Sequence, residues 1–231
     1  MFTGLDWSIL FRAPFSEQLT DAILLTVEIA AYAWVAAMLL GLLAGLARDA
    51  PSAMVRGAAT AHVEIFRNIP VLVQLFFIYY VLPYVGIVLT PFVSGAMGLT
   101  LNYAAYMAEV FRSGIQAIPK GQWEAGSSVG MSRRLLMRRI ILPQAIRIII
   151  PSLGNFFVSI FKDSALVSVI TMRDLMFSGQ LLASATYKHF EIFAMVAVIY
   201  FLISYPTAKF VEWIEAKIDI TRRPVVIGMR G

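Results

Sequence analysis

Lys162 and Asp163 stand side by side at the end of an apolar run and are followed by Ser164. Adjacent residues do not face each other on a helix, so the two charges do not simply neutralise one another. A small zwitterion that carries one ammonium and one carboxylate would match Asp163 and Lys162. These three residues are therefore candidates for binding a small zwitterion. The alternative is that Lys162 extends its ammonium to a membrane surface.

No set of residues in the chain predicts catalysis. His62 and His189 are far apart and lack a partner set, the chain has no cysteine, and no Ser-His-Asp arrangement is apparent. Gly121 and Gly126 have the spacing of the two glycines in a phosphate-binding loop. However, Ser127 stands where that loop needs a lysine, and no strand precedes it. We expect neither ATP hydrolysis nor a metal or cofactor site in this chain.

The composition is that of a membrane protein. Hydrophobic residues make up 59% of the 231 residues, against about 45–50% in soluble domains. Several runs approach the roughly 20 apolar residues that cross a bilayer, and no alternating barrel pattern appears. We predict an all-α integral membrane protein with one domain, residues 1–231, and five transmembrane helices. The predicted spans are Leu19–Ala47, Glu64–Val81, Phe92–Ile118, Ala145–Phe161 and Ile192–Val211.

The distribution of Lys and Arg predicts the orientation of the spans. Most basic residues follow the first span, separate the third from the fourth, or follow the fifth, which marks the cytoplasmic side. The N-terminus then lies outside and the C-terminus inside, with residues 119–143 and 212–231 in the cytoplasm. Residues 1–18 are expected to lie along the membrane surface, with a disordered tail as the alternative. Because topology explains the net charge of +5, we expect no nucleic acid partner.

Four charged residues near the cytoplasmic ends of spans form two similar pairs. Glu64 precedes Arg67 by three positions, and Glu109 precedes Arg112 by three, so each pair can meet on a helix. Charges in membrane segments are costly and are usually paired or functional. We favour ion pairs that tie the helices together at the inner face over a gate that opens with transport.

Other polar or irregular positions mark where a pathway would lie. Gln74 and Asn102 either hydrogen-bond between helices or line the pathway. Pro151, Gly154 and Asn155 are expected to break and kink the fourth span. Irregular backbone at membrane depth is tolerated where it lines a cavity.

The first span carries small residues at steps of four. Ala33, Ala37, Gly41 and Gly45 form a stripe that lets two helix backbones approach closely. We favour packing within the chain as its role, with a contact between subunits as the alternative.

A polar segment between the third and fourth spans has its own helix signals. Pro119 and Gly121 are expected to break the third helix, and Glu124 to open a short helix with its carboxylate at the positive end of the helix dipole. Gly130 is placed to end that helix and Ser132 to cap the next one. By composition alone the segment is a solvated basic loop.

The spacing of residues in this segment indicates a more specific role. Ala125 and Gly126 give the short helix a small-residue face that another protein can approach, and Pro143 marks the entry to the fourth span. The segment reads Glu124-Ala125-Gly126, three residues, Gly130, nine residues, then Ile140-Ile141-Leu142-Pro143. This pattern resembles the E-A-A-x3-G-x9-I-x-L-P loop by which membrane subunits of ABC importers bind their ATPases, with Gly126 in place of the second alanine.

The resemblance covers nearly the whole chain and is closest to permeases for polar amino acids. Three further blocks carry it, at residues 63–75, 105–115 and 162–170. It implies the type I importer fold and docking through Gly121, Glu124, Ala125, Gly126, Gly130, Leu142 and Pro143. It also implies a bacterial inner-membrane, multi-pass location and transport of acidic amino acids or glutamine. The implied partners are two ABC ATPase subunits that bind ATP and magnesium, a second permease subunit (self or sister), an external substrate-binding protein and membrane lipid.

Three alternatives remain open from the sequence. The substrate can be another small zwitterion, such as a basic amino acid, an opine or ectoine. An ion-coupled secondary transporter is less favoured, because five spans do not divide into two equal repeats. An integral membrane enzyme lacks a convergent set of reactive residues.

Overall fold

The structure is a computed structural model that describes residues 15–218, and in that part every regular element is helical. The predicted surface segment, residues 1–18, lies mostly outside the described residues, as does the end of the cytoplasmic tail. The α-helices are α1 (Phe15–Ala47), α2 (Ala53–Asn68), α3 (Val71–Phe76), α4 (Pro91–Gln116), α5 (Lys120–Ser128), α6 (Arg133–Leu136), α7 (Leu142–Asp163), α8 (Leu175–Thr186) and α9 (His189–Ile218). Two π-helical turns, Phe77–Val81 and Met137–Ile141, and two 3-10 segments, Leu82–Val85 and Ser164–Ile170, complete them.

Three helical stretches within the described residues are long and apolar enough to cross a membrane. They are Gln18–Ala47, Arg133–Ile170 and His189–Ile218, and they contain the predicted first, fourth and fifth spans. A fourth span is added if the bent pair Ala53–Asn68 and Val71–Val85 counts as one. Helix α4 coincides with the predicted third span. The total of five spans and their direction across the membrane stay predictions.

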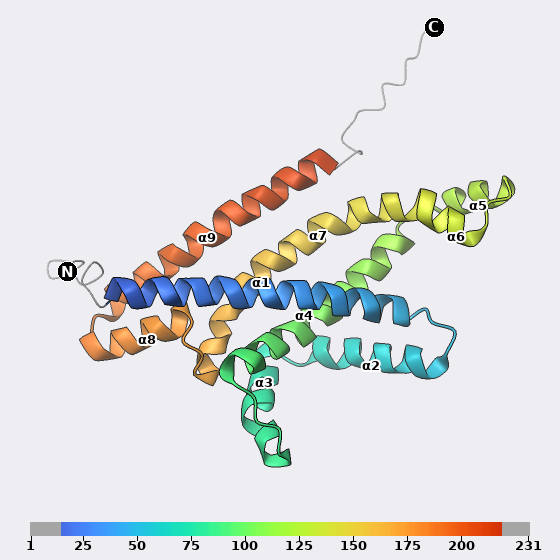
Figure 1. The fold of residues 1–231 in the computed structure, drawn as a ribbon. Helices are drawn as coiled ribbons and strands as arrows, with labels where there is room; N and C mark the ends of the chain where they lie inside the picture. Colours follow the sequence, from blue (N-terminus) through green and yellow to red (C-terminus); the bar gives the residue numbers. More distant parts are fainter. Residues whose placement is uncertain (1–14, 219–231) are drawn as a thin grey trace, which may run out of the picture.

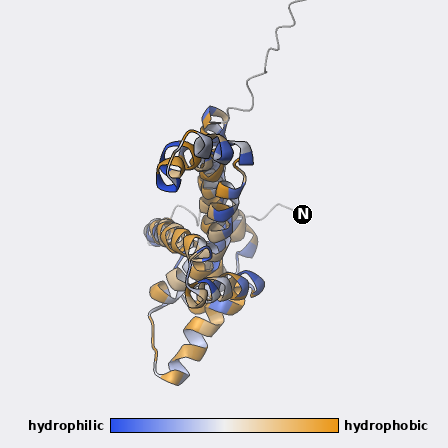
Figure 2. Ribbon diagram, turned by 90° about the vertical axis from the view of Figure 1, so that its right-hand side faces the viewer, coloured by the Kyte–Doolittle hydropathy of each residue, from blue (hydrophilic) through white to orange (hydrophobic). Residues whose placement is uncertain are grey.

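The prediction of one continuous second span, Glu64–Val81, is wrong. Helix α2 ends at Asn68, Ile69 takes an extended conformation (φ −105°, ψ 128°), and the chain turns by 108° into α3. Pro70 explains the break, because it lacks an N–H and disfavours a helical conformation in the residue before it. Helix α3 packs against α4, and the apolar turns that follow it, Phe77–Val81 and Leu82–Val85, project from the body of the molecule (Figures 1 and 2).

The predicted break in the fourth span is also wrong, whereas the kink stays a prediction. Helix α7 runs through Pro151 without interruption, and the residues from 133 onward are already helical. Neighbouring groups can accommodate a proline in a membrane helix. Gly154 serves packing instead, since a Cβ there would lie 2.8 Å from both Cγ atoms of Val211 on α9.

The stripe of small residues on α1 packs against α4, as the favoured interpretation predicts. Added Cβ atoms at Gly41 and Gly45 would each lie 2.9 Å from a backbone oxygen of α4, that of Ala104 and Ala108 respectively. Ala33 and Ala37 are fully buried in the same core. The close approach of α1 and α4 thus forms the centre of the subunit, against which α7 also packs (Figure 1).

Candidate functional site

Helix α5 forms a short arm at one end of the molecule (Figure 1). Gly130 has a left-handed conformation (φ 76°), and its N–H donates to the Ser127 carbonyl at 3.0 Å. The N–H of Met131 donates to the Gly126 carbonyl at 3.1 Å, which completes the paired cap typical of a glycine after a helix. The Ser132 hydroxyl then accepts from the Leu135 N–H at 3.4 Å. The predictions that Gly130 ends the short helix and that Ser132 caps the next one are confirmed.

Three details of the predicted arm are wrong. Pro119, and not Gly121, ends the preceding helix, because Gly121 lies in the first turn of α5. Glu124 is therefore in the middle of α5 and not at its positive end. Gly126 does not contribute to an open small-residue face. It is buried, and a Cβ there would overlap the Leu136 side chain, so its small size allows α6 to fold back onto α5.

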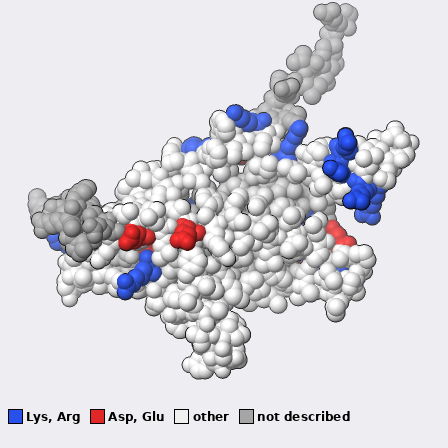
Figure 3. Space-filling model, in the orientation of Figure 1, with Lys and Arg blue, Asp and Glu red and all other residues white. Residues whose placement is uncertain are grey.

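The arm has an exposed surface. Ala125 on α5 and Val129 directly after it are exposed, with Val129 at 76%. The following arginines, Arg133, Arg134, Arg138 and Arg139, are exposed as well, and basic side chains gather at this end of the molecule (Figure 3). Leu142 and Pro143 lie at the start of α7, beyond this surface.

A cavity of about 410 Å³ lies where the α2–α3 corner meets α4 and α7. We call it the Asp163 cavity. The corner contributes residues 67–71, with Arg67 among them. The other lining residues are Asn102, Tyr103 and Tyr106 of α4 and Phe156, Ser159 and Asp163 of α7. The cavity thus combines one carboxylate, one guanidinium and several aromatic rings.

Asp163 is the charged residue among the predicted pathway residues that lines this cavity. Its Oδ2 accepts a hydrogen bond from the Tyr103 hydroxyl at 2.6 Å, which fixes the carboxylate at the cavity wall. Lys162 is exposed and does not line the cavity, so Asp163 and Lys162 do not act as one site. Ser164 is buried and donates to the Phe161 carbonyl at 2.7 Å, which gives it a structural role.

Gln74 and Asn102 both donate hydrogen bonds to backbone carbonyls at the end of α2, where the helix breaks. The amide Nε2 of Gln74 donates to the carbonyls of Phe66 and Ile69 at 2.9 and 2.7 Å, and Nδ2 of Asn102 donates to the Phe66 carbonyl at 2.9 Å. They thereby satisfy carbonyls that the end of α2 leaves without helical partners. Asn102 also lines the Asp163 cavity, whereas Gln74 does not.

Glu109 and Arg112 pair with residues from other parts of the chain and not with each other. Glu109 Oε1 accepts from Nη1 of Arg48 at 2.5 Å and from Nη1 of Arg67 at 3.1 Å, which joins the ends of α1, α2 and α4. Arg112 instead approaches Asp49 at 3.7 Å. The predicted pairing of Glu109 with Arg112 is wrong, because the ends of α1 and α2 bring cationic partners closer to Glu109.

Glu64 lies outside this network. It is exposed, and its carboxylate accepts from Nδ2 of Asn68 at 3.4 Å, so the predicted pair with Arg67 does not form. Sequence reasoning missed that Arg67 lies at the cavity, and it did not identify Tyr103, Tyr106, Phe156 or Ser159 as site residues. The only local signal for Tyr103 is that it follows Asn102 in the chain.

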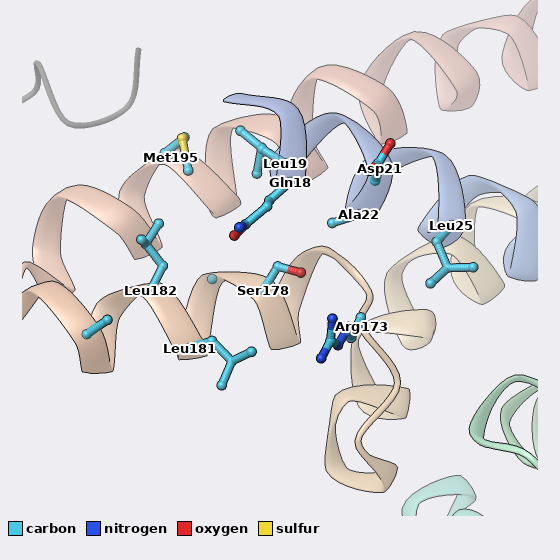
Figure 4. A pocket seen from close by; sticks show the side chains of 12 residues that line it. Gln18, Leu19, Asp21, Ala22, Leu25, Arg173, Ser178, Leu181, Leu182 and Met195 are labelled. Atoms are coloured by element: carbon cyan, nitrogen blue, oxygen red, sulfur yellow. The ribbon is translucent and has the colours of Figure 1, made fainter. Parts of the chain in front are cut away.

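A second cavity, of about 500 Å³, lies between the beginning of α1, α8 and α9 (Figure 4). Gln18 points from α1 toward α8, and Arg173 lies on the segment that precedes α8 (Figure 4). None of the predicted site residues lines it.

Next to Arg173, Asp174 is fully buried and caps α8, accepting from the N–H groups of Phe177 and Met176 at 3.0 and 3.2 Å. Burial raises the pKa of Asp174 to about 6, against an ordinary value of 3.8. Sequence reasoning did not identify this residue, because nothing in its neighbourhood along the chain reveals its burial.

Comparisons with known proteins place this chain among membrane components of transport systems. Residues 37–220 match the family model described as "Binding-protein-dependent transport system inner membrane component". The chain is 34% identical to the probable amino-acid ABC transporter permease protein YckA of Bacillus subtilis, over 94% of this chain and 98% of the relative. It is also 34% identical to the L-cystine transport system permease protein TcyB of the same organism, over 94% and 93% of the two chains.

A solved structure of a known transporter has the same fold as this chain. It is titled as an amino acid ABC transporter with histidines, and its matching chain is 33% identical to this one. The TM-score is 0.88, and the match covers 93% of this chain and all of the other.

Proposed function

The chain belongs to the family of inner membrane components of binding-protein-dependent transport systems, and we propose that it is the permease subunit of an ABC importer for polar amino acids. Members of this family are transport components and not enzymes. In this proposal, a separate ATPase supplies the energy, and an external binding protein delivers the substrate.

The observation that carries the proposal is the pair of opposite charges at one cavity. Asp163 presents a carboxylate that can bind the ammonium of an amino acid, and Arg67 presents a guanidinium for its carboxylate. Tyr103 holds Asp163 in place. Asn102 uses one N–H of its Nδ2 on a backbone carbonyl, so its second N–H and its amide oxygen remain for a substrate.

The charge at the cavity also favours one class of side chain. With one acidic and one basic residue at its wall, the cavity has no surplus charge to match a strongly acidic or basic substrate side chain. We therefore favour amino acids with an uncharged polar side chain, such as glutamine. The name of one relative, a probable glutamine permease, agrees with this choice. Among the alternatives, other zwitterions would use the same two charges.

The arm at α5 supports the proposed partners. Its exposed face, its fixed glycine cap and the basic residues beside it suit docking to a cytoplasmic ATPase that binds ATP and magnesium. We propose two such ATPases and a second permease, either another copy of this chain or a sister chain, in the inner membrane. The second permease completes the pathway, because one subunit encloses the cavity on only part of its perimeter.

Uptake by the complete complex tests the proposal. Proteoliposomes that contain the permease, its ATPase and the binding protein would be given labelled glutamine, glutamate, cystine, arginine and histidine. Asp163→Asn removes the charge that binds the ammonium, a charge-assisted bond of about 1.5–3 kcal/mol, so the apparent affinity should fall about ten-fold or more. Glu212→Gln, a matched change at an exposed ion pair with Lys209 on α9, should behave like the wild type. Unchanged rate and affinity in Asp163→Asn would refute the role of the cavity.

A further inference from the structure

Arg67 belongs to two sites at once. It lines the Asp163 cavity, and its Nη1 lies 3.1 Å from Glu109 Oε1. Its guanidinium carbon lies 5.6 Å from the centre of the Tyr106 ring, another wall of the cavity. The side chain is 39% exposed, so it can reorient without leaving a tightly packed position.

Glu109 has a second cation that holds it more firmly. Arg48 donates to the same oxygen at 2.5 Å, and its side chain is only 12% exposed. The three groups Glu109, Arg48 and Arg67 carry a net charge of +1, and the neighbouring Arg112 is paired with Asp49. One guanidinium is therefore in surplus, and it is the one that faces the cavity.

We propose that Glu109 is a positioning residue that sets how strongly the cavity binds carboxylates, by competing with the substrate for Arg67. In the empty cavity, Arg67 is divided between Glu109 and the cavity. A bound carboxylate takes the guanidinium, the Tyr106 ring keeps it in place through a cation–π contact, and Arg48 continues to neutralise Glu109. This inference rests on the proposed function, because it requires a substrate with a carboxylate.

Arg67 lies close to the bend after α2, so its change of partner from Glu109 to the substrate affects the end of that helix. It lies in the last turn of α2, two residues before the extended Ile69 at which the chain bends. Its bond to Glu109 ties that end of α2 to α4. When the substrate takes the guanidinium, this tie is released while the tie from α1 through Arg48 persists. Binding of a substrate in the cavity thus changes the contacts at the corner between α2 and α3.

Binding to the purified permease–ATPase complex without binding protein tests the inference, using a mixture of the twenty ¹⁴C-labelled protein amino acids as probe. Glu109→Gln frees Arg67 and should lower the dissociation constant about two- to five-fold, the range expected for a partly exposed ion pair. Arg48→Gln leaves Glu109 to Arg67 alone and should raise it by a similar factor. Asp49→Asn removes a nearby carboxylate that does not touch Arg67 and should change nothing.

Two further measurements separate competition from a folding defect. Arg48→Gln/Glu109→Gln leaves no unpaired charge where Arg48 is buried and should bind as tightly as Glu109→Gln. Amino acid amides, which lack the carboxylate, should compete with the probe equally well in the wild type and in Glu109→Gln. Wild-type or weaker binding in both Glu109→Gln and the double variant would refute the role of Glu109 and leave the proposed function standing. Absence of any binding to the wild type would overturn the proposed function with it.

Discussion

The cap of α5 depends on one backbone conformation, and Gly130→Ala tests it directly. The left-handed conformation at Gly130 costs a residue with a Cβ about 1–2 kcal/mol. A Cβ there would meet nothing within 4 Å, so the substitution acts through backbone strain and not through a clash. The affected hydrogen bonds are those donated by residues 130 and 131 to the carbonyls of Ser127 and Gly126. We expect both to open more often in the variant.

Amide hydrogen exchange at residues 130 and 131 measures this opening. A cost of about 1–2 kcal/mol corresponds to about 5- to 30-fold faster exchange. Asn tolerates the left-handed conformation better, so Gly130→Asn should fall between the wild type and Gly130→Ala. Gly121→Ala is the matched control: it lies in α5, the helix that Gly130 caps, also has open space around it, and has no positive φ. If the amides of residues 130 and 131 exchange at the same rate in Gly130→Ala and in Gly121→Ala, the predicted effect of the left-handed conformation on the cap is refuted. Uptake by the complete complex should follow the same order, with Gly130→Asn less impaired than Gly130→Ala.

Two further predictions concern the packing of α1 and the ionisation of Asp174. Gly41→Ala places a methyl group 2.8 Å from Met107 Cβ and 2.9 Å from the Ala104 oxygen. The overpacking, about 1–3 kcal/mol, should exceed the gain in helix propensity of up to about 1 kcal/mol and lower the melting temperature in detergent. Gly57→Ala, with nothing within 4 Å, should not lower it, and equal melting temperatures would contradict the close packing. Since the pKa of Asp174 is raised to about 6, its protonation stabilises the fold fully below about pH 4, by about 3 kcal/mol, and this stabilisation is lost as pH rises through 6. Asp174→Asn should lack this component of the pH dependence, and a wild-type pH profile of thermal stability in the variant would contradict it.

The features that sequence reasoning predicted correctly depend on local chemistry. Gly130 and Ser132 follow turn and cap preferences that act over three or four residues. The small residues of α1, Gly41 among them, follow the helical repeat, and any partner helix had to approach along that face. Such signals need no knowledge of the fold, and the structure confirms them in detail.

The two prolines show where local reasoning fails. Pro70 and Pro151 both lie in apolar surroundings, yet α2 stops before the first and α7 continues through the second. At Pro70, Gln74 and Asn102 supply donors for the carbonyls that a broken helix exposes. Gln74 lies only four residues beyond the break, but Asn102 comes from another helix. Whether a proline breaks a helix thus depended on donors that only the folded chain brings together.

The same dependence decides which polar residues form the cavity. Gln74, Asn102 and Ser164 have equal standing along the sequence as polar groups among apolar ones, and in the fold all three donate to backbone carbonyls. Asp163 differs because a hydroxyl from α4 holds it while its carboxylate still faces a cavity. Arg67 differs because it lines that cavity while Glu109 accepts a hydrogen bond from its guanidinium. The break at Pro70 therefore does more than end a helix: it forms the corner of residues 67–71, which supplies Arg67 to the same cavity as Asp163, and the proposed zwitterion site depends on this pair of charges.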